Sequence, residues 1–157
     1  MIGTGYVGLV SGTCFSDLGN KVYCVDKDLK KINKLKSGIS PIYEPGLSEI
    51  IKKNLKAGRL IFTSDIALAV KKSDLIFICV GTPTIKGTKN VNLTFLYNAV
   101  KEISKYTNKS KIIVTKSTVP VGTGDQIKKI LKKNKRSNFK VVSNPEFLRE
   151  GEAVRDF

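Results

Sequence analysis

Histidine is absent from this sequence of 157 residues. Without it, neither a Ser-His nor a Cys-His nucleophile pair can form, and the HExxH zinc motif is excluded. Any acid–base chemistry must therefore fall to carboxylates, lysine, tyrosine or water.

Cysteine is scarce, and Cys14, Cys24 and Cys79 form an odd, widely spaced set. Such a set favours neither a disulfide framework nor a CxxC zinc site, so we expect no metal and a reducing, cytoplasmic compartment.

Long hydrophobic runs are missing as well. The run at 75–80 is far too short to cross a bilayer, and no secretory signal opens the sequence, so no membrane partner is expected.

Arginine is rare, since only four of the 28 basic residues are arginine, although the formal net charge is +15. Nucleic-acid recognition favours arginine for bidentate contacts, so we assign the lysines to solvated faces and expect no nucleic-acid partner. The densest basic run, Lys128–Arg136, is interpreted as the polar face of a surface helix rather than as a phosphate-binding strip.

Short apolar runs alternate with amphipathic stretches along the chain. This alternation predicts an α/β fold with a doubly wound, Rossmann-like parallel sheet. The strand at 75–80 is the most apolar and is expected to be buried on both faces. Helices are predicted at 28–37, 47–57, 66–72, 93–106 and 126–133. Strands are predicted at 22–26, 60–63, 75–80, 111–115 and 140–143.

A GxGxxG pattern stands at residues 3–8, and an amphipathic helix, a strand and the acidic residue Asp26 follow it. In a dinucleotide-binding fold, Gly3 permits the tight turn, Gly5 lets the backbone approach a pyrophosphate, and Gly8 lets the helix pack on the sheet. A carboxylate at Asp26 accepts hydrogen bonds from ribose hydroxyls and repels a 2′-phosphate. The pattern thus indicates NAD rather than NADP.

The glycine pattern normally follows a central first strand, but only Met1 and Ile2 precede it here. We therefore expect a sheet whose first strand is largely missing at the N-terminus.

Three further motifs each follow a predicted strand: GTP at 81–83, KSTVPVGT at 116–123 and NPEFLREG at 144–151. The first is equally compatible with ligand binding and with an ordinary turn. For the second, helix capping by Ser117 and Thr118 is favoured over ligand contact from position alone. In the third, Glu146 and Glu150 share one side if the segment is helical, and either could act as a base. The alternative is a salt-bridged helix start with Arg149.

These motifs, in this order, resemble the UDP-glucose/GDP-mannose dehydrogenase family. The matching blocks are IGTGYVGLVSG, VDKDLKKINKLKSGISPIYEPGL, FICVGTP, KSTVPVGT and SNPEFLREGEAV. The resemblance implies a two-step, NAD-dependent oxidation of a nucleotide sugar's primary alcohol to a carboxylate, through a cysteine-bound thiohemiacetal and thioester. It favours UDP-glucose as the substrate, with GDP-mannose as the alternative, and implies a homodimer for the full-length enzyme.

The resemblance also implies roles for individual residues. Thr118 and Glu146 would be catalytic, because they would hold or activate the hydrolytic water. The residues implied in NAD binding are Gly3, Gly5, Tyr6, Val7, Gly8, Asp26, Lys31, Thr82, Thr118 and Glu150. Those implied in contacting the sugar nucleotide are Glu146, Phe147, Leu148, Arg149 and Glu150.

The sequence departs from the family in what it lacks: a GGSCFPKD-like segment with the nucleophilic cysteine, the linking helix and the sugar-site lysine. Cys24 and Cys79 are predicted to lie within strands as buried small hydrophobes. We therefore expect residues 1–157 to be an NAD-binding domain truncated at both ends, without the central helix and the C-terminal UDP-sugar domain, and inactive alone. A non-catalytic dinucleotide-binding module is the alternative.

Overall fold

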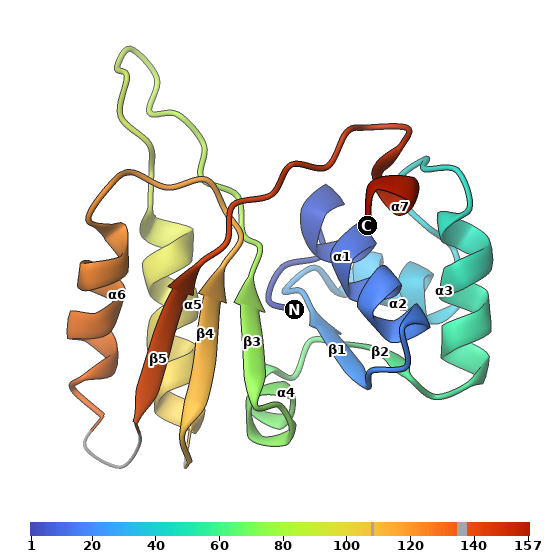
Figure 1. Cartoon of the computed structure of the whole chain (residues 1–157), viewed down its shortest axis with the longest axis horizontal. Coiled ribbons are helices and arrows are strands. Elements are labelled where there is room, and N and C mark those ends of the chain that lie inside the picture. Colours follow the sequence, from blue (N-terminus) through green and yellow to red (C-terminus); the bar gives the residue numbers. More distant parts are fainter. Residues whose placement is uncertain (108, 135–137) are drawn as a thin grey trace.

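The computed structural model describes residues 1–107, 109–134 and 138–157 (Figure 1). Two residues of the predicted basic run, Lys135 and Arg136, lie outside the described residues. In the rest of that run, the lysine side chains are exposed while Ile127 and Leu131 are buried, which confirms the polar face of a surface helix.

All strand pairs are parallel, as predicted. The first set pairs β1 with β2, and the second set has the order β3-β4-β5. The strands are β1 (Val22–Val25), β2 (Leu60–Thr63), β3 (Leu75–Ile78), β4 (Lys111–Thr115) and β5 (Phe139–Ser143).

The first three residues join the two sets of strands at the place of the central strand. Ile2 forms parallel bridges to Val25 on one side and to Ile78 on the other. Its amide donates to the Phe77 carbonyl at 2.8 Å, and its own carbonyl accepts from the Cys79 amide at 2.8 Å. With this segment counted, the order is β2-β1-(Ile2)-β3-β4-β5, which is that of a Rossmann sheet.

Helices cover the two faces of this sheet (Figure 1). The alternating side chains of each strand separate two hydrophobic clusters, one on each face. The helices whose side chains enter the first cluster are α1 (Tyr6–Asp17), α2 (Leu29–Lys36), α3 (Leu47–Lys56) and the short α7 (Ala153–Asp156). Those of the second are α4 (Ile66–Lys72), α5 (Thr94–Tyr106) and α6 (Thr123–Leu131).

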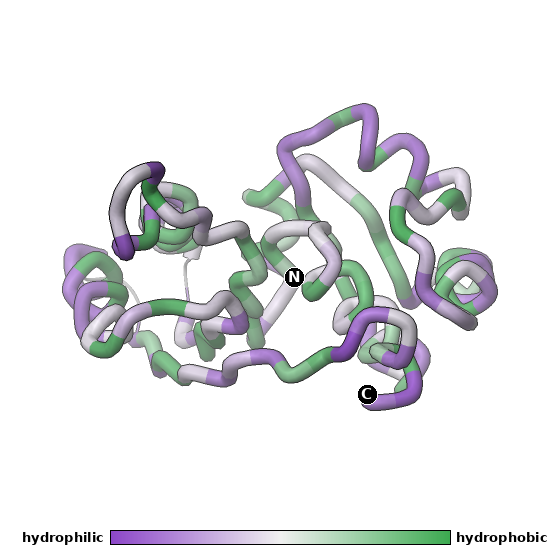
Figure 2. Tube along the Cα trace, turned by 90° about the horizontal axis from the view of Figure 1, so that it is seen from above, coloured by the Kyte–Doolittle hydropathy of each residue, from purple (hydrophilic) through white to green (hydrophobic). Residues whose placement is uncertain are grey.

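Local signals place several helix ends. Asp28 and Asp65 cap α2 and α4, because their carboxylates accept from the amides of Lys31 and Leu68. Outer helices such as α3 and α6 are amphipathic, because hydrophobic and hydrophilic residues alternate within each turn (Figure 2). Within the part of the chain that the structure describes, no helix is long and apolar enough to cross a membrane.

Two predictions about secondary structure are wrong in detail. The apolar run at 75–80 ends as a strand at Ile78 and is not buried on both faces, since Leu75 is 47% exposed. Helix α6 begins at Thr123 rather than at residue 126, because Gly122 adopts a left-handed conformation at its N-cap. Leu75 stands at the start of β3, whereas Phe77 on the same face packs against Phe15 of α1.

Candidate functional site

A groove of about 240 Å³ lies at the carboxyl edge of the sheet. Because the carboxyl ends of parallel strands meet at one edge, the motifs that follow different strands come together there. All four motifs contribute to the lining of the groove, together with the two residues before the GTP motif: Gly5, Tyr6, Val7, Cys79, Val80, Gly81, Thr82, Lys116, Ser117, Thr118 and Glu146.

The glycine loop has the shape that a dinucleotide requires. A Cβ at Gly8 would stand 2.0 Å from the carbonyl oxygen of Gly3, so only glycine lets α1 approach the loop this closely. Gly3 has a φ of +100°, and a Cβ there would meet the Cys79 carbonyl oxygen at 2.5 Å. At Gly5, by contrast, no atom lies within 4 Å of an added Cβ, which leaves its backbone open toward a ligand.

Helix α1 points its N-terminus at the groove. Gly5 is the N-cap in an extended conformation, and the amide of Leu9 donates to its carbonyl at 2.9 Å. The amides of Tyr6, Val7 and Gly8 precede this bond and have no acceptor within the helix. Together with the helix dipole they suit an anionic group such as a pyrophosphate, so the loop fits the phosphates of NAD.

Asp26 follows β1 and is held by three neighbours. Its Oδ2 accepts from the Thr4 hydroxyl at 2.6 Å, the Thr4 amide at 3.0 Å and the Lys31 ammonium at 3.0 Å. Its Oδ1 accepts from the Asp28 amide at 3.1 Å. Burial by itself would raise the pKa of Asp26, but these hydrogen bonds outweigh it and lower the pKa to about 2. The carboxyl is thus ionised at neutral pH and can accept ribose hydroxyls.

The hydroxyls after β3 and β4 are hydrogen-bonded across the groove. Thr82 Oγ1 donates to the Thr118 carbonyl at 2.9 Å, and Ser117 Oγ donates to the Val80 carbonyl at 2.6 Å. The predicted capping role of Ser117 and Thr118 is wrong, because the N-cap of α6 is Gly122 and no side chain caps this helix. These bonds join the GTP and KST motifs into one wall.

Sequence reasoning missed Lys116, which lines the groove and is only 8% exposed. The register of β3, β4 and β5 places Cys79, Lys116 and Asn144 in one row on the face that carries α1. Lys116 Nζ lies 3.5 Å from Asn144 Oδ1, and among the described residues no carboxylate oxygen is within 4.0 Å of it. The burial of Lys116 was not predicted from the sequence.

The segment after β5 is not helical between residues 144 and 149, so the expected helical spacing of Glu146 and Glu150 is wrong. Glu146 turns back to accept the Leu148 amide at 2.7 Å and lines the groove. Arg149 pairs with Asp156 rather than with a glutamate of the motif, with an N–O distance of 2.6 Å.

The predicted site residues therefore fall into separate places. Glu146 meets Tyr6, Val7, Thr82 and Thr118 in the groove. Two predicted cofactor residues, Asp26 and Lys31, form their own cluster beside the glycine loop. The predicted residues that do not line the groove also include Gly3 and Gly8 of the glycine loop, Phe147, which is 87% exposed, Leu148, which packs against the α1 core cluster, Arg149 and Glu150.

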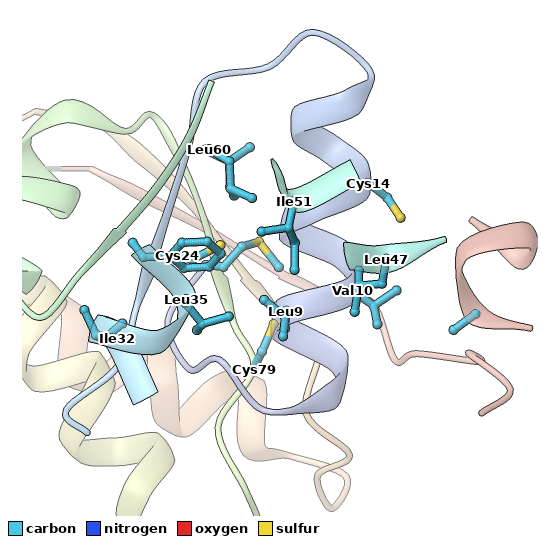
Figure 3. Close-up of a cluster of buried hydrophobic side chains, with 14 residues drawn as sticks. Leu9, Val10, Cys14, Cys24, Ile32, Leu35, Leu47, Ile51, Leu60 and Cys79 are labelled. Carbon is cyan, nitrogen blue, oxygen red and sulfur yellow. The ribbon is translucent and has the colours of Figure 1, made fainter. Parts of the chain in front are cut away.

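None of the three cysteines has the setting of a nucleophile. Cys24 and Cys79 lie among aliphatic side chains of the core (Figure 3). Burial raises the pKa of Cys14 and Cys24 to about 11 and that of Cys79 to about 12. The prediction that Cys79 lies within a strand is wrong, since β3 ends at Ile78 and Cys79 stands at the edge of the groove.

The sequence matches the model of the UDP-glucose/GDP-mannose dehydrogenase family, NAD binding domain, over residues 1–157. It is 52% identical to UDP-glucose 6-dehydrogenase of Rhizobium meliloti, over 100% of this chain and 36% of that protein. It is 55% identical to UDP-glucose 6-dehydrogenase TuaD of Bacillus subtilis, over 99% of this chain and 34% of that protein. The chain thus spans about a third of the length of these relatives.

A solved UDP-glucose dehydrogenase from Pyrobaculum islandicum is similar, with a TM-score of 0.94 and 36% identity, over 99% of this chain and 37% of the other. A GDP-mannose dehydrogenase from Pseudomonas aeruginosa has a TM-score of 0.93 and 36% identity, with the same coverage. The fold expected from the sequence is confirmed by this similarity and by the strand order.

Proposed function

This chain belongs to the UDP-glucose/GDP-mannose dehydrogenase family and matches its NAD binding domain. We propose that it is the cofactor-binding part of an enzyme that oxidises UDP-glucose to UDP-glucuronate. The curated relatives that are more than 50% identical support UDP-glucose over GDP-mannose. In this proposal residues 1–157 form one NAD-binding domain, and the nucleophilic cysteine and the sugar-binding domain lie outside them.

The groove at the carboxyl edge carries the proposal, because it brings Glu146 of the last motif onto the glycine loop. A module that only bound a dinucleotide would not need a carboxylate of the NPEFLREG segment at this place. Glu146 is half-buried and stands beside Thr118, where a water molecule can be held between a hydroxyl and a carboxylate.

In this proposal, different residues in and around the glycine loop bind different parts of NAD. The amides of Tyr6, Val7 and Gly8 would bind the pyrophosphate, and Asp26 would accept the adenosine ribose hydroxyls beside Lys31. Bound NAD would accept hydride from the substrate carbon. Thr82 and Thr118 would contact NAD, and Glu150 would lie near the nicotinamide.

The chain's own groups then orient substrate and water. Glu146, as a carboxylate, would take the proton of the water that releases the acid, and Thr118 would fix the direction of that water. Glu150 and the backbone of residues 147–149 would contact the sugar nucleotide from the outer side of the groove. Histidine is not needed, because a carboxylate relays the proton.

Titration calorimetry with NAD tests the first half of this proposal. We expect binding that is weakened about tenfold or more in Asp26→Ala, because hydrogen bonds to a charged group are lost. Incubation of the chain with NAD and UDP-glucose tests the second half. We expect no steady formation of NADH, because in this proposal residues 1–157 contain neither the nucleophilic thiolate that carries the covalent intermediate nor the domain that positions the sugar. Steady formation of two NADH for each sugar would contradict the placement of the nucleophile outside this chain.

A further inference from the structure

The carboxylate of Glu44 links two ends of the candidate site that are far apart in the sequence. Glu44 lies in the loop before α3, and its side chain is buried, with 5% exposure. Its Oε2 accepts from the Tyr6 hydroxyl at 2.6 Å and from the Gly151 amide at 2.9 Å. Its Oε1 accepts from the Ala153 amide at 2.8 Å. A buried carboxylate with such partners is a strong and directional link.

The partners of Glu44 belong to two different parts of the site. Tyr6 stands in the glycine loop and at the start of α1, where the amides face the proposed pyrophosphate. Gly151 and Ala153 end the NPEFLREG segment and open α7. The Tyr6 hydroxyl also lies 3.3 Å from the carbonyl oxygen of Arg149. The side chain of Tyr6 is therefore committed to the link, while its backbone remains available to the cofactor.

Few other contacts hold the last segment to the rest of the chain. Between residues 144 and 150 the backbone has no helix or strand. Among the described residues, the Tyr6–Arg149 hydrogen bond and the packing of Leu148, Ala153, Val154 and Phe157 also hold its end, whereas the Arg149–Asp156 pair is internal to the segment. Glu44 is thus the polar anchor of residues 149–153.

We propose that Glu44 is a positioning residue that couples occupancy of the glycine loop to the order of residues 149–153, through Tyr6. This rests on the proposed function, in which the loop binds NAD and the segment contacts the sugar nucleotide. NAD holds the loop and the first turn of α1 in place, and with them the Tyr6 hydroxyl. Glu44 then keeps its bonds to Gly151 and Ala153 for a larger fraction of the time. By linkage, order in the segment favours NAD binding to the same degree.

Amide hydrogen exchange of residues 149–154, with and without saturating NAD, tests this proposal on the chain itself. NAD binding is measured separately by calorimetry on every variant. In the unaltered chain we expect NAD to slow exchange in this segment by about fivefold or more. In Glu44→Gln we expect faster exchange without ligand and no further effect of NAD, because the amide group places a donor opposite the backbone amides.

Two further variants separate coupling from simple anchoring. Tyr6→Phe leaves Glu44 its bonds to Gly151 and Ala153, so exchange without NAD stays close to that of the unaltered chain, but the effect of NAD is lost. Glu49→Gln removes an exposed carboxylate from nearby α3 and serves as the charge-matched control that behaves like the unaltered chain. NAD that binds without slowing exchange at 149–154, or an unchanged NAD effect in Tyr6→Phe, overturns the coupling. Absence of NAD binding in the unaltered chain contradicts the proposed function as well.

Discussion

The hydroxyl of Thr4 donates a 2.6 Å hydrogen bond to the carboxylate of Asp26. Thr4 is 1% exposed and occupies a variable position of the GxGxxG pattern, so the glycine loop is tied directly to the end of β1. This bond, with the Lys31 ion pair, fixes the direction in which Asp26 faces. The carboxylate that we propose to favour NAD over NADP is therefore oriented by the chain's own groups.

Cofactor preference follows from this arrangement. We expect the unaltered chain to bind NAD more tightly than NADP, because the ionised Asp26 repels a 2′-phosphate. In Asp26→Ala we expect a smaller difference in affinity between NAD and NADP, because NAD loses its ribose acceptor and Lys31 is released to attract the 2′-phosphate. Calorimetry with both nucleotides measures this difference in affinity. Asp125→Asn, an exposed carboxylate on α6, serves as the control. Equal or tighter NADP binding by the unaltered chain would contradict the role of Asp26.

The low pKa of Asp26 makes part of the stability depend on pH. Its pKa falls from 3.8 to about 2 on folding, so the stabilisation is present above pH 4 and is lost as the pH falls toward 2. A shift of this size corresponds to about 2 kcal/mol. We expect the difference in unfolding free energy between the unaltered chain and Asp26→Asn to shrink by about this amount from pH 5 to pH 2. Urea titrations at each pH measure it, and a difference that is independent of pH would refute the assignment.

Replacement of Gly8 by alanine tests the close approach of α1 to the glycine loop. The added Cβ would stand 2.0 Å from the Gly3 carbonyl oxygen, so helix or loop must move. We expect a loss of about 2 kcal/mol or more in the free energy of unfolding, together with weaker NAD binding. Gly124→Ala is the matched control, because no atom lies within 4 Å of its added Cβ in α6. That control should gain about 0.5–1 kcal/mol. Equal effects of the two substitutions would show that α1 can move freely.

Two buried lysines are expected to respond differently to methionine. Within the described residues, the one hydrogen bond of the Lys116 ammonium is the long contact to Asn144, whereas Lys111 donates to the Ser73 carbonyl. A buried cation without an acidic partner costs stability, so Lys116→Met should leave the stability unchanged or raise it by about 1 kcal/mol. Lys111→Met should lower it by about 1 kcal/mol, because a hydrogen bond is lost. Thermal unfolding of both variants decides the matter, and a large loss in Lys116→Met would point to a stabilising partner of its ammonium group.

Thiol reactivity tests the view that none of the cysteines is a nucleophile. With pKa values of about 11 to 12, at most about one thiol in a thousand is ionised at pH 8. We expect all three to react with a disulfide reagent at least about 100-fold more slowly in the native chain than in guanidinium chloride, where access and ionisation are restored. Rapid labelling of Cys79 in the native chain would contradict this view and make Cys79 a candidate nucleophile, because it lines the groove.

Patterns local in the sequence predicted most of the fold. The strand at 111–115 and the helix at 66–72 depend on neighbours within a few residues, and the structure confirms them. The exposure of Leu75 and the early start of α6 were not predictable in this way. The first depends on which helix covers a strand, and the second on the backbone conformation of Gly122.

The sequence by itself determined the α/β class, the parallel strands and the residues available for chemistry, because periodicity and the spacing of the glycine motif report backbone geometry directly. Tertiary structure alone decided which of those residues meet. It brought Glu146 to the glycine loop and buried Lys116 beside Asn144. It also placed Glu44 between Tyr6 and Gly151, positions 38 and 107 residues away along the chain. The physical reason is that such contacts depend on the register of β3, β4 and β5 and on the path of the last segment, neither of which a local pattern encodes.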